Sequence, residues 1–304
     1  MRLPVSRPTG RAGFTLIEII VVIAIIGILA ALLAGVVINL LAKGPELVDR
    51  TNLTNLNGGI QRFYNEYKCY PPSKLFLANS RALYMSPLPA GVSPTLAKTS
   101  LEYLGTMFPK LDWTQPIDWS GGLATTTLNT TGVILEGDQC LVFCLGGIPT
   151  RDAQGNFGCL GFNKASGYKN PTASGGERFT AFEFQSDRLV QRAGSSFLSY
   201  NNPHGKPQPY AYFSSYKSEN GYATISSSYT GNPSDCAGLG VAPYYKATTP
   251  ITQYHNPKGY QLISAGTDGQ FAPGGQWTAA NAPNIGAAGK DDISNFHPNF
   301  LGTP

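Results

Sequence analysis

The sequence predicts an α+β fold in which one long N-terminal helix precedes a globular head built largely from antiparallel strands. Three observations predict it. Residues 14–42 form an almost unbroken apolar run, and residues 43–70 repeat apolar side chains at spacings of three and four. The rest of the chain places short apolar segments between turns rich in Gly, Pro and Asn. A helix followed by strands is the element order of α+β domains.

The apolar run contains a single ionisable side chain, that of Glu18. As a helix, residues 14–42 would extend roughly 40 Å, more than the ~30 Å hydrocarbon core of a bilayer. An unpaired carboxylate at the centre of a membrane costs about 2.5–3.5 kcal/mol on insertion scales. Glu18 therefore needs a cationic partner. Cleavage after Gly13 would supply one, because it places a new α-amino group on Phe14.

The segment before the run, residues 1–13, is a basic leader that contains Arg2, Arg7 and Arg11. Positive residues stay on the cytoplasmic side, so the C-terminal part is expected outside the inner membrane. The leader is not typical of a secretory signal peptide, because the apolar run is too long and no small-residue cleavage site follows it. Without the leader, 19 Lys and Arg residues face 18 Asp and Glu residues. We therefore expect no nucleic-acid partner.

Residues 43–70 predict a second, amphipathic half of the same helix, which ends before Tyr70-Pro71-Pro72. The residues expected on its buried face are Leu47, Leu53, Leu56, Ile60, Phe63 and Tyr67.

Residues 71–304 are the expected head. Only 13% of all residues are charged, which suits a loop-rich extracytoplasmic domain. Period-two patterns and flanking turns predict four strands. They are residues 179–184, 196–200, 210–213 and 260–264. Residues 73–130 carry few signals, and no element is assigned to them.

The chain contains five cysteines, an odd number, so at least one is not paired within the chain. Cys140 and Cys144 would share one face of a short helix, and Cys159 lies within reach of them in sequence. These three residues are candidates for a disulfide, which an extracytoplasmic location permits. Reduced core cysteines are the alternative. A zinc site is disfavoured, because no two cysteines are separated by two residues and no histidine cluster is nearby.

The segment Gly13-Phe14-Thr15-Leu16-Ile17-Glu18 resembles the prepilin signal of the type IV pilin and type II secretion pseudopilin superfamily. The resemblance implies that a prepilin peptidase cuts between Gly13 and Phe14 and methylates the Phe14 amine. It also implies that Glu18 pairs with the N-terminus of a neighbouring subunit during assembly.

Two C-terminal segments, residues 259–269 and 289–296, are similar to the head of the major pseudopilin of type II secretion. The resemblance implies a calcium site, with Asp268 and Asp292 as ligands and Asp291 and Ser264 as helpers. Carboxylates and carbonyls in a Gly-rich loop are ligands that calcium accepts. An ordinary turn at Asp268-Gly269, with Asp291 and Asp292 capping a short helix, is the alternative. The stretch from 269 to 290 is longer than that family's usual loop.

We therefore expect a structural subunit of a type II secretion pseudopilus, rather than an enzyme. The implied partners are further copies in a filament, the prepilin peptidase, the inner-membrane assembly platform and minor pseudopilins. The implied location is the bacterial inner membrane, crossed once, with the head in the periplasm and the subunit later extracted into a filament. A surface type IV pilus subunit and a tethered or filament-tip binding protein are alternatives. The three histidines, His204, His255 and His297, occur in no catalytic motif.

Overall fold

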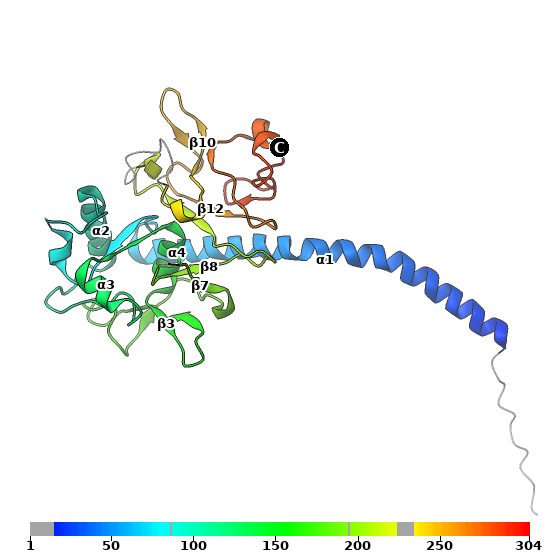
Figure 1. Ribbon diagram of the computed structural model, residues 1–304, viewed down its shortest axis with the longest axis horizontal. Coiled ribbons are helices and arrows are strands. Elements are labelled where there is room, and N and C mark those ends of the chain that lie inside the picture. Colours follow the sequence, from blue (N-terminus) through cyan, green and yellow to red (C-terminus); the bar gives the residue numbers. More distant parts are fainter. Residues whose placement is uncertain (1–14, 86, 194, 224–233) are drawn as a thin grey trace, which may run out of the picture. The chain divides into compact units, whose positions relative to one another are not determined.

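The computed structural model describes residues 15–85, 87–193, 195–223 and 234–304 (Figure 1). The chain divides into two compact units, residues 1–45 and residues 46–304, the second of which is the head. The first helix, α1, comprises Leu16–Tyr67 and contains Pro45. Its last turn is followed by Lys68, which has a φ of +56°, and then by Tyr70-Pro71-Pro72. The helix thus ends before Tyr70, as the sequence predicts.

Three further α-helices lie in the head: α2 (Pro94–Met107), α3 (Thr125–Thr130) and α4 (Gly137–Gly146). Ser93 caps α2, because its Oγ accepts a hydrogen bond from the Leu96 amide at 3.1 Å and Pro94 occupies the first turn. A capping box formed by Glu136 and Gln139 starts α4. The short helix expected around Cys140 and Cys144 is therefore confirmed, and every residue of α4 is buried.

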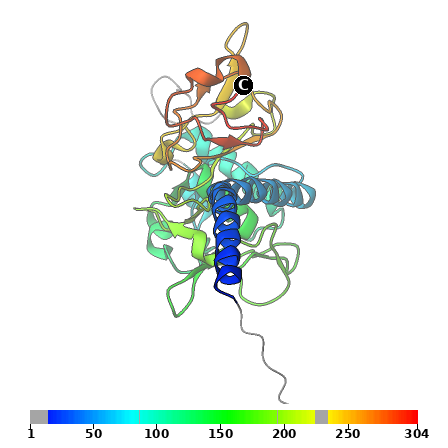
Figure 2. The same ribbon diagram turned by 90° about the vertical axis from the view of Figure 1, so that its right-hand side faces the viewer.

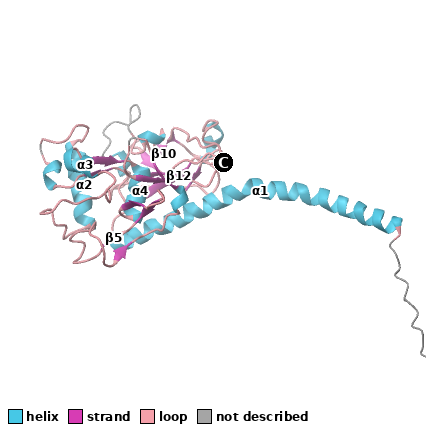
Figure 3. Ribbon diagram, turned by 60° about the horizontal axis from the view of Figure 1, so that its bottom comes forward, coloured by secondary structure: helices cyan, strands magenta, loops and turns pink. Residues whose placement is uncertain are grey.

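The strands of the head are short, and loops make up much of it (Figure 3). One three-stranded sheet has the order β14-β12-β9 and is antiparallel throughout. A second has the order β11-β10-β13, in which β10 and β13 are parallel. The other strands pair as β1-β2, β3-β4, β5-β6 and β7-β8. The bounds are β1 Leu75–Leu77, β2 Val133–Leu135, β3 Pro149–Arg151, β4 Phe157–Cys159, β5 Phe162–Asn163, β6 Arg178–Phe179, β7 Leu189–Gln191, β8 Leu198–Tyr200, β9 Ala211–Ser214, β10 Tyr244–Ala247, β11 Gln253–Tyr254, β12 Tyr260–Ser264, β13 Gly275–Gln276 and β14 Ile293–Ser294.

The strands expected at 196–200, 210–213 and 260–264 correspond to β8, β9 and β12. The prediction of a strand over 179–184 is wrong beyond Phe179, where β6 ends. The backbone amides that follow form hydrogen bonds with a helix instead of with a neighbouring strand. The amides of Ala181 and Phe182 both donate to the carbonyl of Leu145 at the end of α4, at 2.8 and 3.1 Å. These amides cap a helix, so no second strand is required for their hydrogen bonds.

Buried apolar side chains form two clusters in the head. The larger one contains Leu56, Ile60 and Phe63 of α1 together with much of α2 and α4. The smaller one consists of side chains between Ala211 and Leu301, a range coloured yellow to red in Figure 2, whereas Tyr212 and Leu262 of the same range belong to the larger cluster. Leu47 was expected in the core and is instead 68% exposed. Asp49 is buried one half-turn later, so the buried face of α1 begins with a carboxylate.

Candidate functional site

The first candidate site is the start of α1. The Thr15 amide and hydroxyl donate to Glu18 Oε2 at 2.8 and 2.9 Å, and the Glu18 amide donates to Thr15 Oγ1 at 3.3 Å. This is a capping box, which satisfies amides that have no partner at a helix N-terminus. Gly13 and Phe14, the expected cleavage and methylation residues, lie outside the described residues. Glu18 is therefore positioned by Thr15 at the helix start.

The helix that follows contains a segment, Leu16–Ala34, that is long and apolar enough to cross a bilayer. None of this segment is buried within the protein. Its large side chains are 50–78% exposed, from Leu16 to Leu33. No other helix in the described part of the chain has this length and composition. Such a surface requires an apolar environment outside the chain, either lipid or protein.

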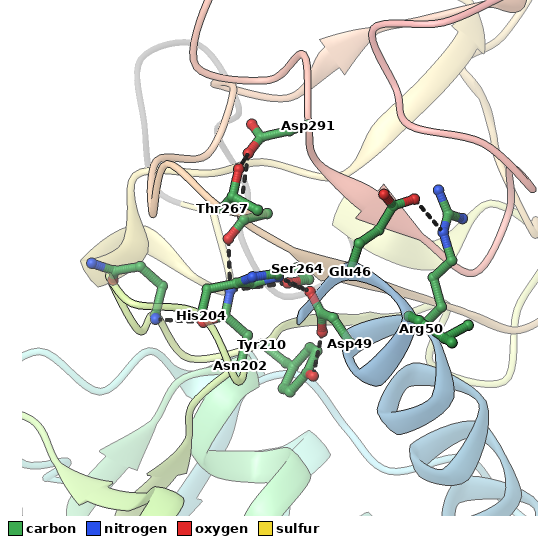
Figure 4. Close-up of polar contacts among 12 residues, drawn as sticks. Glu46, Asp49, Arg50, Asn202, His204, Tyr210, Ser264, Thr267 and Asp291 are labelled. Carbon is green, nitrogen blue, oxygen red and sulfur yellow. Dashed lines mark hydrogen bonds and ion pairs between the residues drawn. The ribbon is translucent and has the colours of Figure 1, made fainter. Parts of the chain in front are cut away.

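The second candidate site surrounds Asp49, on the turn of α1 with which the head begins (Figure 4). Its carboxylate is fully buried and accepts three hydrogen bonds. The Ser264 hydroxyl and His204 Nε2 lie 2.6 and 2.8 Å from Oδ2, and the Tyr210 hydroxyl lies 2.5 Å from Oδ1. Among the described residues, His204 is the only basic side chain that contacts this carboxylate. A buried carboxylate is tolerated only with such partners.

The Asp49 cluster joins three parts of the head. Ser264 ends β12, and His204 lies in the turn between β8 and β9. Asn202 extends the cluster, because its Nδ2 donates to Ser264 Oγ at 3.1 Å and to the Gly266 carbonyl at 3.2 Å. The next residue of α1, Arg50, donates to the Pro298 carbonyl at 2.6 Å. The guanidinium of Arg50 also pairs with Glu46 at 3.1 Å and lies 5.0 Å from the Phe300 ring centroid.

The third candidate site is the expected calcium loop. Asp291 Oδ2 accepts hydrogen bonds from the Thr267 amide and hydroxyl, each at 2.6 Å, and from the Asp268 amide at 3.0 Å. Asp268 Oδ1 accepts from the Gln270 amide at 2.8 Å. Gly266 has a φ of +61°, and a Cβ there would meet the Asp291 carbonyl at 2.3 Å. Only glycine allows Asp291 to approach the loop so closely.

Asp292 is fully buried next to this loop. Its Oδ2 accepts from the Ala272 amide at 3.0 Å, and its Oδ1 has no hydrogen-bond partner. Burial raises the pKa of Asp292 to about 8, and the neighbouring carboxylates of Asp291 and Asp268 also raise it.

The four expected calcium residues are thus divided. Asp291 accepts a hydrogen bond from the Asp268 amide and precedes Asp292 in the chain, whereas the hydroxyl of Ser264 belongs to the Asp49 cluster. In the part of the chain that the structure describes, no three His, Cys, Asp or Glu side chains are grouped to hold a metal ion.

The structure contains no disulfide at the candidate residues Cys140, Cys144 and Cys159, because all five cysteines are free thiols. Cys140 and Cys144 are one turn apart on α4, where Cβ atoms are separated by about 5–6 Å. A disulfide needs about 3.5–4.5 Å. Burial raises the pKa of both thiols well above the ordinary value, so they remain protonated core groups.

The Asp49 cluster contains the residue types of a serine–histidine–aspartate triad but not its geometry. Ser264 and His204 both contact Asp49 Oδ2, and no hydrogen bond between Ser264 and His204 occurs among those described. The three side chains are buried, so a substrate has no access to the serine. A nucleophile must be bonded to its base. The hydrogen bonds to Asp49 instead connect α1 with the end of β12, with the turn between β8 and β9 and with Tyr210.

Asp49 was missed as a site residue by sequence reasoning. A signal was present: Asp49 precedes Leu53 by four residues, so it continues the buried stripe of α1 toward the N-terminus. The partners of Asp49 come from residues 155 to 215 positions away, which no local pattern indicates.

Comparison with known families gives one match. Residues 9–34 match the family model described as the prokaryotic N-terminal methylation motif. No curated protein and no solved structure matches the chain. The motif, together with the apolar helical segment that it includes, defines a chain with a signal of the type IV pilin and pseudopilin kind. The motif implies processing by a prepilin peptidase and filament assembly in general, together with a single membrane-anchoring helix.

Proposed function

We propose that this protein is a pseudopilin, a structural subunit of a type II secretion pseudopilus that polymerises through its N-terminal helix. One observation carries the proposal: the methylation motif at residues 9–34 includes an exposed apolar helical segment, Leu16–Ala34, whose first turn contains Glu18. After cleavage at Gly13, the Phe14 amine of one copy would neutralise the Glu18 carboxylate of another. The partners are further copies, the peptidase, the inner-membrane platform and minor pseudopilins, with the head in the periplasm.

The C-terminal part of the head favours a pseudopilus over a surface pilus. Strand β12 leads into the Ser264–Gly269 loop, and the chain closes through β14 after Asp291 and Asp292. This order is similar to the major pseudopilin. Surface pilins of many kinds end in a cysteine-closed loop, and the last cysteine here is Cys236, a free thiol.

We also propose that Asp268 and Asp292 hold calcium, with Asp291 as a further carboxylate. The unpartnered Oδ1 of Asp292 supports it, because a buried carboxylate next to two others is relieved by a cation. Ser264 is a weaker candidate, since its hydroxyl already donates to Asp49. Bound calcium would hold this loop at the side of the head where β12 ends.

The processing step is tested by mass spectrometry of the assembled protein, which should begin at a methylated Phe14. Gly13→Leu should block cleavage, whereas Gly10→Leu, a matched change within the leader, should leave it intact. Assembled material that still begins at Met1 would end the proposal.

The assembly step is tested with two variants of Glu18. Gln at this position can keep the capping box with Thr15 but carries no charge. If charge pairing drives assembly, Glu18→Gln and Glu18→Ala should both reduce filament yield, because losing one partner of a buried ion pair costs about 3–5 kcal/mol. Normal filaments from Glu18→Gln would refute pairing. The same overexpression separates a filament subunit from a tip-located binding protein, which would not form fibres alone.

The calcium proposal is tested by melting the full chain in detergent with calcium and with chelator. Calcium in hundredfold excess over Kd should stabilise the head by roughly 2.7 kcal/mol. Asp268→Ala and Asp292→Ala should remove the difference, and magnesium should substitute poorly. Asp187→Ala, at an exposed carboxylate in another part of the head, is the control. Identical curves in calcium and chelator would leave Asp268-Gly269 as an ordinary turn.

A further inference from the structure

We propose that the head carries a binding site for a dianionic phosphate group, at a cavity beside the C-terminal end of α1. The cavity has a volume of about 390 Å³, which is within the size range of small-ligand pockets. The residues that line it come from the last turn of α1, from the three residues that follow this helix and from the two loops that follow β9 and β11. They are Tyr64, Lys68, Cys69, Tyr70, Lys217, Ser218, Glu219 and Lys258.

The cavity concentrates positive charge on a chain that is otherwise nearly neutral. Three of its lining residues are lysines and one is a glutamate. Glu219 pairs with Lys258 at 3.4 Å, which neutralises one of the three ammonium groups. Lys68 forms no ion pair with any described residue, and Lys217 contacts only the Thr106 hydroxyl, at 3.2 Å, and the Tyr103 ring. Two uncompensated positive charges remain, which match a dianion.

The backbone around this cavity is unusual. Seven described non-glycine residues have positive φ, and five of them line the cavity or lie within two residues of its lining. The five are Lys68, Tyr216, Lys217, Asn220 and Asn256. Asparagine adopts this region readily, whereas lysine and tyrosine seldom do, so the strained positions are Lys68, Tyr216 and Lys217. Such residues persist where surrounding contacts determine the conformation, often at ligand clamps. Strain at this density on one rim points to a shape that is maintained for a purpose.

Hydrogen bonds tie the two lysine-bearing loops together. The Asn220 amide donates to the Pro257 carbonyl at 2.7 Å, and the Ser215 amide donates to the Gly259 carbonyl at 2.9 Å. The Asn256 side chain donates to the Tyr260 carbonyl at 3.0 Å, at the start of β12. Lys217 and Lys258 are therefore carried by loops of fixed separation. Such preorganisation lowers the entropy lost when a ligand is bound.

The remaining lining residues favour phosphate over a metal ion or an apolar ligand. The tyrosine rings of Tyr64 and Tyr70 lie 4.7 Å apart and form a partly apolar wall. Cys69 is buried, and burial raises its pKa to about 11, so it is a neutral thiol. Lysine ammonium groups bind phosphate as point charges. The Ser218 hydroxyl donates to the Ser215 carbonyl at 3.2 Å, which leaves its oxygen as an acceptor and the lysines as the donors for a ligand. Inorganic phosphate, a phosphorylated sugar and a lipid phosphomonoester all share this chemistry.

Another explanation of Lys68 must be distinguished. A cation after the last turn of a helix stabilises it by interacting with the helix dipole. That role predicts a lower melting temperature on substitution but no response to phosphate. The proposed site does not depend on filament assembly, so it can be tested on the unassembled protein.

The experiment titrates inorganic phosphate into the full chain in phosphatidylcholine nanodiscs, at constant ionic strength balanced with chloride, by calorimetry. We expect one saturable site that weakens as salt increases. Lys68→Gln, Lys217→Gln and Lys258→Gln should each raise Kd about fivefold or more, since each removes a unit charge a few ångströms from the ligand. Lys98→Gln is the control, because Lys98 is 80% exposed on α2. Lys217→Arg keeps the charge, so it should bind phosphate and confirm that substitution at this position permits folding.

Absence of saturable binding, or equal weakening in Lys98→Gln, would overturn the proposal. A loss of stability in Lys68→Gln with unchanged phosphate affinity would assign Lys68 to the helix dipole and would also overturn it. Repeating the titration in nanodiscs that contain phosphatidic acid identifies the source of the ligand. Loss of free-phosphate binding there indicates a lipid headgroup, and retained binding indicates a soluble phosphate.

Discussion

The two halves of α1 are built from similar apolar residues and have opposite burial. Between Leu16 and Leu33 the large side chains are 50–78% exposed, whereas Leu56, Ile60 and Phe63 are 0% exposed. The first half is apolar on every face, and the second is apolar only at spacings of three and four. The comparison shows that apolar content alone determines whether a helix avoids water. The periodicity of the apolar side chains along the helix determines whether it packs on its own domain.

The largest expected effect is a difference in the free energy of unfolding when a leucine is replaced by alanine in one half of α1 or in the other. Leu56→Ala should lower the free energy of unfolding of the head by about 2–5 kcal/mol, because it leaves a cavity in the larger core cluster. Leu29→Ala, at a 53% exposed position, should leave that free energy unchanged. Denaturant unfolding of the full chain in detergent measures both, with fluorescence of Trp113, Trp119 and Trp277 reporting on the head alone.

Equal losses from the two substitutions would show that the halves unfold as one unit. The comparison would then be wrong in energetic terms, even though the burial of the side chains differs.

The next effect concerns the point at which burial begins. Asp49→Ala should destabilise the head by about 3–5 kcal/mol, because the hydroxyls of Tyr210 and Ser264 and the ring of His204 lose their acceptor. Glu102→Gln is the control: this exposed carboxylate of α2 contacts Lys98 at 4.0 Å and should change stability by less than about 1 kcal/mol. Thermal unfolding in detergent distinguishes the two variants. Equal melting temperatures would mean that the hydrogen bonds of Asp49 do not stabilise the head.

The smallest effect is a pH dependence in the smaller core cluster. Burial lowers the pKa of His255, and the nearby charges of Lys246 and His297 lower it further. A hydrogen bond to the Trp277 carbonyl at 2.9 Å raises this pKa and offsets part of the decrease. Because the folded pKa is below the unfolded value of 6.5, the unfolded chain takes up the proton first. The contribution of His255 is therefore fully present above pH 6.5 and is lost as the pH falls.

His255→Gln should flatten the decrease in stability between pH 7 and pH 5, measured by denaturant unfolding at each pH. His297→Gln changes a half-buried histidine whose ring lies 4.9 Å from that of Trp277 and which itself lowers the pKa of His255, so it should flatten the decrease only in part. An unaltered pH profile in His255→Gln would assign the decrease to other groups.

The sequence predicted those elements whose signals are local. The apolar run, the amphipathic stripe and strand β12 depend on neighbouring residues, and Tyr260–Ser264 was assigned with correct bounds. The strand over 179–184 failed because the amides of Ala181 and Phe182 bond to the distant carbonyl of Leu145. The Asp49 cluster and the lysine cavity could not be predicted for the same reason. Each is assembled from loops whose proximity is set by the folded chain, not by residue spacing.

The carboxylate of Asp49 also has a bearing on the order of folding. Its contacts to His204, Tyr210 and Ser264 span 155, 161 and 215 residues, and that of Arg50 to Pro298 spans 248. Closing loops of this length lowers the conformational entropy of the chain before any contact stabilises the closed form. We therefore expect these contacts to form late in folding. A chain that emerges N-terminus first exposes the start of its head until nearly the last residue has followed. We expect this delay to make unfinished chains the form most exposed to proteases and aggregation.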